Sequence, residues 1–193
     1  MTSSNPDARP SFCTVRLTAQ PVVKQHAAVM AEVLRDPLTY RFLEEGPPSV
    51  SKLERQYEFL AGGKSPDGTE HWLTWILIPK DQTTPIGFVQ ATVREPDTVH
   101  VAYLLAPAAW RKGYGYEAVS GMLEVVFARY DVARAVAEMD TRNVASIGLV
   151  EALGFRHAGT NREAAMFEDG VSHEHVYELP QSEWRRRGTT GAS

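Results

Sequence analysis

Two glycines separated by a single residue, Gly113 and Gly115, stand directly before a stretch in which apolar residues have helical spacing. Glycines at such a place allow backbone N–H groups to converge on one point, where the N-terminus of a helix adds about half a positive charge. This turn suits a bound anion, and a pyrophosphate in particular. Arg111 and Lys112 precede the turn and add positive charge at its rim. A tight strand-to-helix turn that binds nothing is the alternative that the pattern leaves open.

The turn formally matches the dinucleotide-binding fingerprint G-x-G-x-x-G/A, with Ala118 in the last position and Glu138 where the ribose-binding acid is expected. That fingerprint belongs in the first βα turn of a parallel sheet, immediately after a strand. Here several expected strands and a loop that contains Pro107 come first, so we reject a dinucleotide site. A Walker A loop is excluded as well, because the sequence has no G-x-x-x-x-G-K-S/T.

Other residues with chemical potential give weaker signals. His173 and His175 share a face of an expected strand, but two ligands make a poor zinc site and the spacing suggests no third, so we expect no metal. His100, on an expected central strand, is interpreted as a core or cleft histidine rather than a catalytic one. Cys13 is the only cysteine; it cannot form an internal disulfide, and we expect it to be a buried small hydrophobic residue.

Length and composition describe an ordinary globular chain of 193 residues, of which 43% are hydrophobic and 23% charged. A chain of this length buries a core without needing disulfides or a structural metal. The formal net charge of −4 has the wrong sign for a domain whose affinity comes from nucleic-acid phosphates. No segment approaches the ~20 consecutive apolar residues of a membrane span, and the first residues are polar. We therefore expect a cytoplasmic protein, monomeric or homodimeric, that binds neither nucleic acid nor membranes.

The elements that must position the glycine turn follow from apolar spacing and from helix-breaking residues. A strand is expected over Phe12–Ala19 and a helix over Val22–Leu34, which Pro37 ends. A capping box at Ser51–Glu54 opens a second helix, which stops at Gly62. These segments precede the main part of the expected sheet.

Three strands then follow in quick succession, at His71–Ile78, Ile86–Arg94 and Val99–Leu105. Their connectors are short enough for hairpins, so this part of the sheet should be antiparallel. A helix over Gly115–Tyr130 leads to a further strand over Ala133–Met139. Because a helical crossover joins parallel strands, the strands at Val99 and Ala133 should be parallel neighbours.

A last helix is expected to begin at Thr141 or Asn143 and to end at Gly154. A hairpin of two strands, Phe155–Arg162 and Ser172–Leu179, closes the sheet. The predicted fold class is α+β, with a central mixed, mostly antiparallel sheet of about seven strands flanked by about four helices.

The expected domain runs over residues 12–180 without an internal linker. Residues 1–11 and 185–193 are expected to be flexible termini. The basic cluster Arg185–Arg187 belongs to the second of them, and we interpret it as solvated chain end rather than as a binding patch.

Two motifs in this order resemble the acetyl-CoA-binding core of the GNAT N-acetyltransferases. The first is Q/R-x-x-G-x-G/A, here Trp110-Arg-Lys-Gly-Tyr-Gly115, and the second is N-x-x-S/A followed by L-G-F, here beginning Asn143-Val-Ala-Ser146. Trp110 in place of Gln or Arg, Ser146, and the opening Thr14-Val-Arg-Leu17 make the chain similar to the branch of ribosomal-protein-alanine N-acetyltransferases. The resemblance covers about residues 12–180 and implies the GNAT fold and an acyltransferase.

The resemblance also implies acetyl-CoA as the co-substrate. In this family the amides of the turn hold the CoA pyrophosphate, the preceding strand pairs with the pantetheine arm, and the asparagine binds the same arm. The corresponding residues are Arg111, Lys112, Gly113, Tyr114, Gly115 and Tyr116 for the pyrophosphate, Tyr103, Leu104 and Leu105 for the arm, and Asn143 and Ser146 beside it. Asn143 also opens a helix, so capping that helix is an equally good interpretation of it.

Acetylation by a thioester needs a neutral amine, a polarised carbonyl and a proton for the leaving thiolate, and it needs no protein nucleophile. The family's usual tyrosine acid is replaced here by Val150. The resemblance therefore implies Ser146 as the group that serves the thiolate, with a small residue packed at a helix start as the alternative. It implies Glu138 or Glu163 as the base, with a solvated charge at a strand end as the alternative for each.

The acceptor is less defined than the cofactor. The resemblance implies a primary amine, and the α-amine of a protein N-terminus is the first expectation. A small amine such as an antibiotic, a polyamine or an amino acid is the second, and a non-catalytic acyl-CoA-binding module that keeps the fold is a third of a different class. Trp72, Trp75 and Tyr40 are expected to line the acceptor cleft or to pack in the core.

Overall fold

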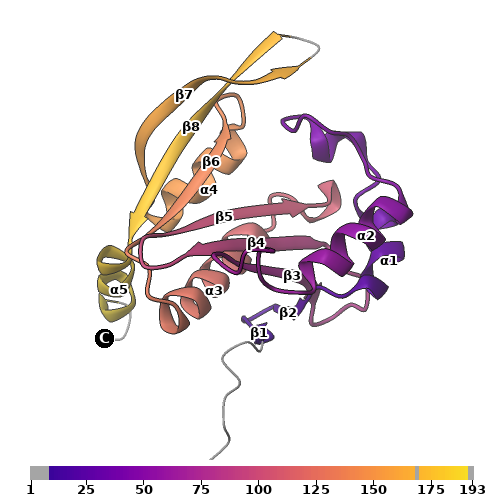
Figure 1. Ribbon diagram of the computed structural model, residues 1–193, viewed down its shortest axis with the longest axis horizontal. Helices are drawn as coiled ribbons and strands as arrows, with labels where there is room; N and C mark the ends of the chain where they lie inside the picture. The colour runs from indigo at the N-terminus through magenta and orange to yellow at the C-terminus, as the bar shows by residue number, and fades with distance from the viewer. Residues whose placement is uncertain (1–8, 168–169, 191–193) are drawn as a thin grey trace, which may run out of the picture.

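An eight-stranded sheet forms the centre of the protein in the computed structural model, which describes residues 9–167 and 170–190 (Figure 1). The strand order is β1-β2-β3-β4-β5-β6-β8-β7. The strands are β1 (Phe12–Cys13), β2 (Leu17–Pro21), β3 (His71–Pro79), β4 (Gly87–Arg94), β5 (Thr98–Leu105), β6 (Arg134–Asp140), β7 (Arg156–Phe167) and β8 (Gly170–Pro180). The α-helices are α1 (Ala27–Val33), α2 (Val50–Leu60), α3 (Tyr114–Arg129), α4 (Val144–Leu153) and α5 (Gln181–Thr190).

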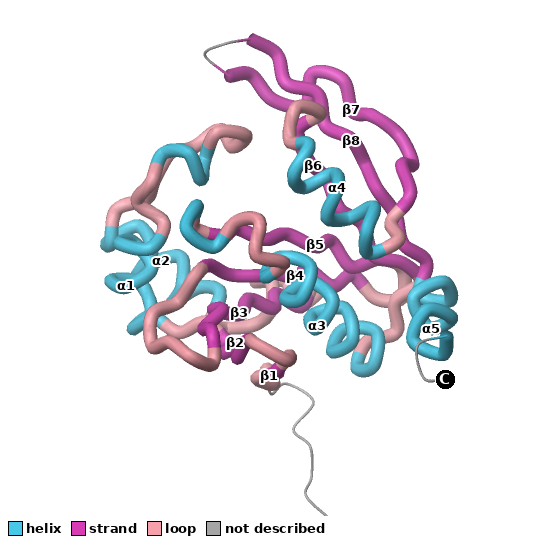
Figure 2. The backbone as a smooth tube through the Cα atoms, turned by 180° about the vertical axis from the view of Figure 1, so that it is seen from behind, coloured by secondary structure: helices cyan, strands magenta, loops and turns pink. Residues whose placement is uncertain are grey.

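Helices cover both faces of the sheet, with α1 and α2 on one face and α3 and α4 on the other (Figures 1 and 2). Met30 of α1 and Leu53 of α2 share a buried cluster with Ile76 of β3. On the other face, α3 contributes fully buried side chains to a larger cluster, among them Met122 and Leu123. Each such side chain is worth roughly 1.5–3 kcal/mol of burial. This packing fixes α3, and with it the glycine turn, against the sheet.

The two central strands β5 and β6 are parallel and separate from one another part-way along. Among the described residues the two strands pair from Thr98↔Arg134 to His100↔Val136. Strand β5 then continues to Leu105 without β6 beside it. On its other side, β5 stays paired with β4 along its whole length. The edge of β5 that faces β6 is therefore open beyond His100, and Figure 1 shows β6 turning away there.

Most predicted elements are confirmed. The strands at His71, Gly87 and Thr98 form antiparallel hairpins, and β5 and β6 are parallel neighbours joined through α3. Helix α4 is capped by Asn143 and ends at Gly154, whose φ is +95°. Helix α2 begins two residues earlier than predicted, because Ser49 rather than Ser51 caps it by accepting a hydrogen bond from the backbone nitrogen of Lys52 at 3.2 Å.

The single strand expected over Phe12–Ala19 is wrong, and it accounts for the additional strand. The backbone nitrogen of Thr14 donates to the carbonyl oxygen of Leu17 at 2.9 Å, which makes a turn and divides the segment into the antiparallel pair β1 and β2. Val15 lies in this turn and is 86% exposed. Cys13 is also exposed, so the expectation of a buried thiol is wrong as well. A two-residue strand at the sheet edge has no layer over its outward face to bury the side chain.

The chain end also differs from the prediction. Residues 181–190 form helix α5 instead of an unstructured tail, and Arg185–Arg187 lie within it. Trp184 is buried and its ring centre lies 6.4 Å from that of Phe127 on α3. The burial of Trp184 against Phe127 explains why this helix packs on the domain. The sequence analysis missed the contact because the residues around Trp184 are polar and basic.

Gly87 provides a stability test of the β4–β5 pairing that positions β5. Its φ is +151°, and a Cβ at this position would lie 2.1 Å from the carbonyl oxygen of Leu104 and 2.8 Å from Cα of Leu105. Gly87→Ala is therefore expected to lower the free energy of unfolding by about 3 kcal/mol or more, measured by urea denaturation. Gly159→Ala, where a Cβ meets nothing within 4 Å, serves as the matched control. Equal stability of the two variants would contradict the prediction.

Candidate active site

The turn before α3 holds two residues in the left-handed backbone conformation. Gly113, the N-cap, has a φ of +78°, and Arg111 has a φ of +60°. The conformation costs glycine little, whereas a residue with a Cβ loses about 1–2 kcal/mol. Within the described chain no side chain caps α3, and the first N–H groups of a helix have no carbonyl partner inside it. The turn therefore presents backbone donors and the positive end of a helix to an anion.

Arg16, just before β2, contacts both the glycine turn and the first turn of α3. Its Nη1 donates to the carbonyl oxygen of Lys112 at 2.9 Å, and its Nε donates to Oε2 of Glu117 at 2.6 Å. Its guanidinium also lies over the ring of Tyr114, 4.6 Å from the ring centre. The other oxygen of Glu117 accepts hydrogen bonds from the hydroxyl of Thr14 and the backbone nitrogen of Arg16. These contacts tie the segment between β1 and β2 to the first turn of α3.

The charge of Glu117 is compensated inside the protein. Burial raises the pKa of Glu117, but hydrogen bonds from Thr14 and Arg16 lower it by more, so the pKa lies below its usual range. The carboxylate is therefore ionised at neutral pH and paired with Arg16. Because this pair is internally balanced, the helix N-terminus, Arg111 and Lys112 are left to attract an external anion.

The start of α4 is fixed beside the open edge of β5. Oδ1 of Asn143 accepts a hydrogen bond from the backbone nitrogen of Ser146 at 3.2 Å, which confirms that Asn143 caps the helix. The hydroxyl of Tyr103, on β5, donates to the carbonyl oxygen of Ser146 at 3.3 Å. Burial raises the pKa of Tyr103 to about 12, so this hydroxyl keeps its proton and remains a donor at neutral pH.

Close contacts hold the glycine turn beside the end of β5 and beside α4. Nε1 of Trp110 donates to the carbonyl oxygen of Leu105 at 2.7 Å, which joins the loop before α3 to the end of β5. A Cβ on Gly115 would lie 2.6 Å from Cδ1 of Leu149 on α4 and 3.5 Å from Cδ1 of Leu105. A side chain on residue 115 would displace Leu149, so glycine lets α3 and α4 approach without that shift. With the Tyr103 hydrogen bond, these contacts gather the turn, β5 and α4 around the open strand edge.

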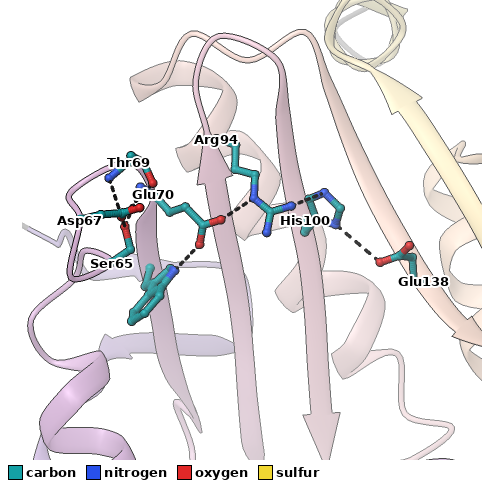
Figure 3. Close-up of polar contacts among 8 residues, drawn as sticks. Ser65, Asp67, Thr69, Glu70, Arg94, His100 and Glu138 are labelled. Carbon is teal, nitrogen blue, oxygen red and sulfur yellow. Dashed lines mark hydrogen bonds and ion pairs between the residues drawn. The ribbon is translucent and has the colours of Figure 1, made fainter. Parts of the chain in front are cut away.

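A chain of polar contacts crosses the face of the sheet opposite to α3 and α4, and it ends where β5 and β6 separate (Figure 3). Glu70 accepts hydrogen bonds from Nε1 of Trp72 at 2.8 Å and Nε of Arg94 at 2.5 Å. These bonds lower the pKa of Glu70. Nη1 of Arg94 lies 3.2 Å from Nε2 of His100, whose Nδ1 lies 3.6 Å from Oε2 of Glu138. The side chain of Glu138 is 40% exposed, so solvent or a ligand can reach it.

Comparison with known proteins identifies the family. Residues 16–156 match the acetyltransferase (GNAT) domain family. The chain belongs to the GNAT family. A protein of Bacillus licheniformis named uncharacterized N-acetyltransferase p20 is 21% identical over 171 residues, which cover 89% of this chain and 96% of that protein.

Solved structures share the GNAT fold. The ribosomal L7/L12 α-N-protein acetyltransferase RimL, solved in complex with coenzyme A, has a TM-score of 0.78 at 14% identity and covers 90% of this chain and 99% of its own. Spermidine N-acetyltransferase from Vibrio cholerae, solved with CoA and spermine, has a TM-score of 0.75 at 16% identity and covers 88% and 98%. Because residues 16–156 match the acetyltransferase (GNAT) domain family, the protein is an acyltransferase.

The structure of this GNAT acyltransferase brings together the residues that the sequence analysis assigned to CoA. The gathered positions are Tyr103, Leu104, Leu105, Arg111, Lys112, Gly113, Tyr114, Gly115, Tyr116, Asn143 and Ser146. Glu138 lies on the strand that separates from β5, facing the other side of the sheet. Glu163 falls within the long strand β7 rather than after a shorter one, and its side chain lies outside the described residues. Val150 is fully buried.

The remaining candidates are placed as follows. Trp75 is fully buried core, whereas Trp72 is half-buried and Tyr40 packs at the margin of the α1–α2 cluster. His175 contacts His157 and Thr160. Among the described residues no three metal-ligating side chains gather. No described helix has the length and apolar character needed to cross a bilayer.

Sequence reasoning missed two features of the GNAT site. Arg16 was part of a stretch noted only for its resemblance, and its contact with Glu117 spans 101 positions of the chain. The contact between Arg94 and His100 depends on the register of β4 against β5, which pairs Thr92 with His100 and Arg94 with Thr98. The short connector between these strands is the signal that indicates their adjacency.

Proposed function

We propose that this GNAT protein is an acetyl-CoA-dependent N-acetyltransferase that moves the acetyl group directly to a primary amine. The observation that carries the proposal is the separation of β5 from β6 beside the N-terminus of α3. An open strand edge inside a sheet offers backbone groups that need partners. A pantetheine arm supplies amides of its own, and the helix N-terminus at one end of that edge suits the pyrophosphate.

In this arrangement the backbone of the turn, with Arg111 and Lys112, binds the pyrophosphate. The open edge of Tyr103–Leu105 pairs with the pantetheine arm, and the carboxamide of Asn143 donates to the same arm while its oxygen caps α4. The thioester then lies where β5 leaves β6, between the α4 side and the side of Glu138. Backbone N–H groups of β5 beyond His100 stabilise the oxyanion of the tetrahedral intermediate.

The transfer itself needs two proton movements. The amine loses a proton as its nitrogen attacks the thioester carbonyl, and the carbon–sulfur bond breaks to release the CoA thiolate, which takes up a proton. Ser146, in the first turn of α4, is our candidate for the group that donates to the thiolate. The burial of Val150, at the position of the family's usual tyrosine, supports this assignment.

Glu138 is the candidate base, and Glu163 is the second. Deprotonating a lysine-like amine with a pKa of about 10.4 costs about 4.6 kcal/mol at pH 7, against about 1 kcal/mol for an α-amine with a pKa of about 7.8. An α-amine can therefore be served by a base that acts through water. The 40% exposure of the Glu138 side chain suits such a base.

The α-amine of a protein N-terminus is the acceptor class that we favour, and a small amine is the second. The likeness of the fold to RimL supports the first class and the likeness to a spermidine N-acetyltransferase supports the second. The deciding experiment mixes acetyl-CoA with peptides of different N-terminal residues, with polyamines and with amino acids, and detects free thiol and product mass. Thiol release with an acetylated peptide supports the proposal. CoA binding without turnover on any amine would indicate a non-catalytic acyl-CoA-binding module.

Ser146→Ala tests the assigned proton donor. We expect kcat to fall by about tenfold or more, because general acid catalysis contributes about 10²–10⁴-fold and water can replace part of it. The dissociation constant of CoA should change little. Ser51→Ala, likewise in the first turn of a helix but outside the site, serves as the control. Full turnover of Ser146→Ala would remove this serine from the mechanism.

A further inference from the structure

Arg94 determines which nitrogen of His100 carries the proton. Nη1 of Arg94 lies 3.2 Å from Nε2 of His100. A guanidinium has N–H donors and no acceptor, and it keeps its charge at any physiological pH. Nε2 must therefore be the acceptor of this hydrogen bond, which leaves the proton of the neutral imidazole on Nδ1.

Glu70 holds Arg94 in this place. Its carboxylate accepts a hydrogen bond from Nε of Arg94 at 2.5 Å and a second from Nε1 of Trp72 at 2.8 Å. Glu70 immediately precedes β3 and Arg94 ends β4, so Arg94 is held beside His100 only because the sheet aligns these strands with β5 (Figure 3). The tautomer of His100 is thus fixed by the sheet itself.

The Nδ1–H group of this tautomer faces Glu138. The distance from Nδ1 to Oε2 of Glu138 is 3.6 Å, longer than a hydrogen bond. Hydrogen bonds between catalytic groups are often long in the absence of substrate and shorten in the reacting complex. The Glu138 side chain is 40% exposed, and we expect it to rotate and close this gap in the reacting complex. The hydrogen bond from His100 would then hold the Glu138 carboxylate in one orientation, at the place where β5 and β6 separate.

Other carboxylates lie near Glu138. Burial raises the pKa of Glu174, on the neighbouring strand β8, and the charges of Glu138, Asp140 and Glu44 raise it further. Asp140 is held by Arg142 through hydrogen bonds from its backbone and its guanidinium. Glu138 therefore shares its side of the sheet with other carboxylates, which repel it. The N–H of His100 gives it an attractive contact on the side toward β5.

We propose that His100 is a positioning residue that directs the carboxylate of Glu138 through its Nδ1–H group, in the tautomer set by Arg94. This inference rests on the proposed function of Glu138 as the base for the acceptor amine. His100 does not itself take the proton, because the lone pair of its Nε2 is occupied by Arg94. It acts on the reaction only through Glu138.

The tautomer is tested without any turnover. A long-range ¹⁵N–¹H correlation spectrum of the labelled protein distinguishes a protonated Nδ1 from a protonated Nε2. We expect the signature of a proton on Nδ1 in the unaltered protein, and partial loss of this preference in Arg94→Gln, which lacks a cationic donor. A spectrum with the proton on Nε2, or with both nitrogens protonated at neutral pH, would overturn the inference.

Two variants of His100 separate its two nitrogens in turnover assays. Asparagine places an amide N–H near the position of Nδ1, whereas glutamine places its amide near Nε2 and leaves Glu138 without a donor. We expect His100→Asn to keep kcat within about threefold and His100→Gln to lose about tenfold, with the KM for acetyl-CoA unchanged in both. A merely structural role predicts the reverse order, because glutamine is closer to histidine in size.

The same variants in a Glu138→Gln background complete the test. If His100 acts through Glu138, neither variant lowers kcat further there, whereas independent roles would give additive losses. Additive losses would overturn the proposal. Absence of turnover in the unaltered protein with every amine would instead disprove the proposed function and the positioning role with it, while the tautomer spectrum would still report whether Arg94 sets the protonation of His100.

Discussion

Gly113→Val is expected to raise the KM for acetyl-CoA by about tenfold or more and to raise the dissociation constant of CoA in parallel. Gly113 has a φ of +78°, which a β-branched residue adopts only at a cost of about 1–3 kcal/mol. A Cβ there would also lie 3.3 Å from Nη2 of Arg16, the side chain that braces the turn. We expect the backbone to rotate away from this conformation, so that the amides no longer converge on the pyrophosphate. Steady-state kinetics and calorimetric titration with CoA measure the effect.

Graded and distant substitutions control this result. Gly113→Ala introduces the Cβ without branching and should give a smaller rise in KM. Gly148→Ala changes an exposed glycine of α4 at which a Cβ meets nothing within 4 Å, and it should leave KM unaltered. If Gly113→Val bound CoA as tightly as the unaltered protein does, the turn would not be the pyrophosphate site.

Glu138→Gln is expected to lower kcat/KM for a lysine-like amine by about a hundredfold at neutral pH, because a positioned base contributes about 10²–10⁴-fold. The loss should be smaller for an α-amine, because its lower pKa makes it easier to deprotonate near pH 7. For either acceptor the loss should shrink as the pH rises toward the pKa of the amine, because the neutral amine then needs no base. Kinetics across a pH series measure both trends.

Glu178→Gln provides the matched control for Glu138. Glu178 lies on the same face of the sheet, opposite Val136, and pairs with Arg134. Its replacement should leave kcat/KM unchanged. A Glu138→Gln variant with unaltered kcat/KM at all pH values would transfer the role of the base to Glu163 or to solvent.

The elements of the proposed cofactor site were largely predictable because they depend on local signals. The glycines before α3 predict the turn, and Asn143 and Gly154 mark the two ends of α4 by capping rules. The helical crossover between β5 and β6 predicts their parallel pairing. Each of these inferences needs only a short window of sequence.

The contacts around the proposed base were not predictable in the same way because they depend on register and on distant partners. Arg94, His100 and Glu138 meet only once β4, β5 and β6 are aligned. The brace from Arg16 to Glu117 likewise joins residues that no periodicity connects. The turn at Thr14 and the docking of α5 through Trp184 escaped prediction because a single tertiary contact overrode the local pattern.

We propose that coenzyme A binds along the open edge of β5 with its pyrophosphate at the turn before α3. Titrating coenzyme A into ¹⁵N-labelled protein and following the backbone amide resonances tests this claim most directly. We predict that the largest shifts occur at residues 113–116 and 103–105, while the amides of β1 and of the loop over 80–84 stay in place. Saturable binding that leaves the amides of 113–116 and 103–105 unmoved would contradict the claim.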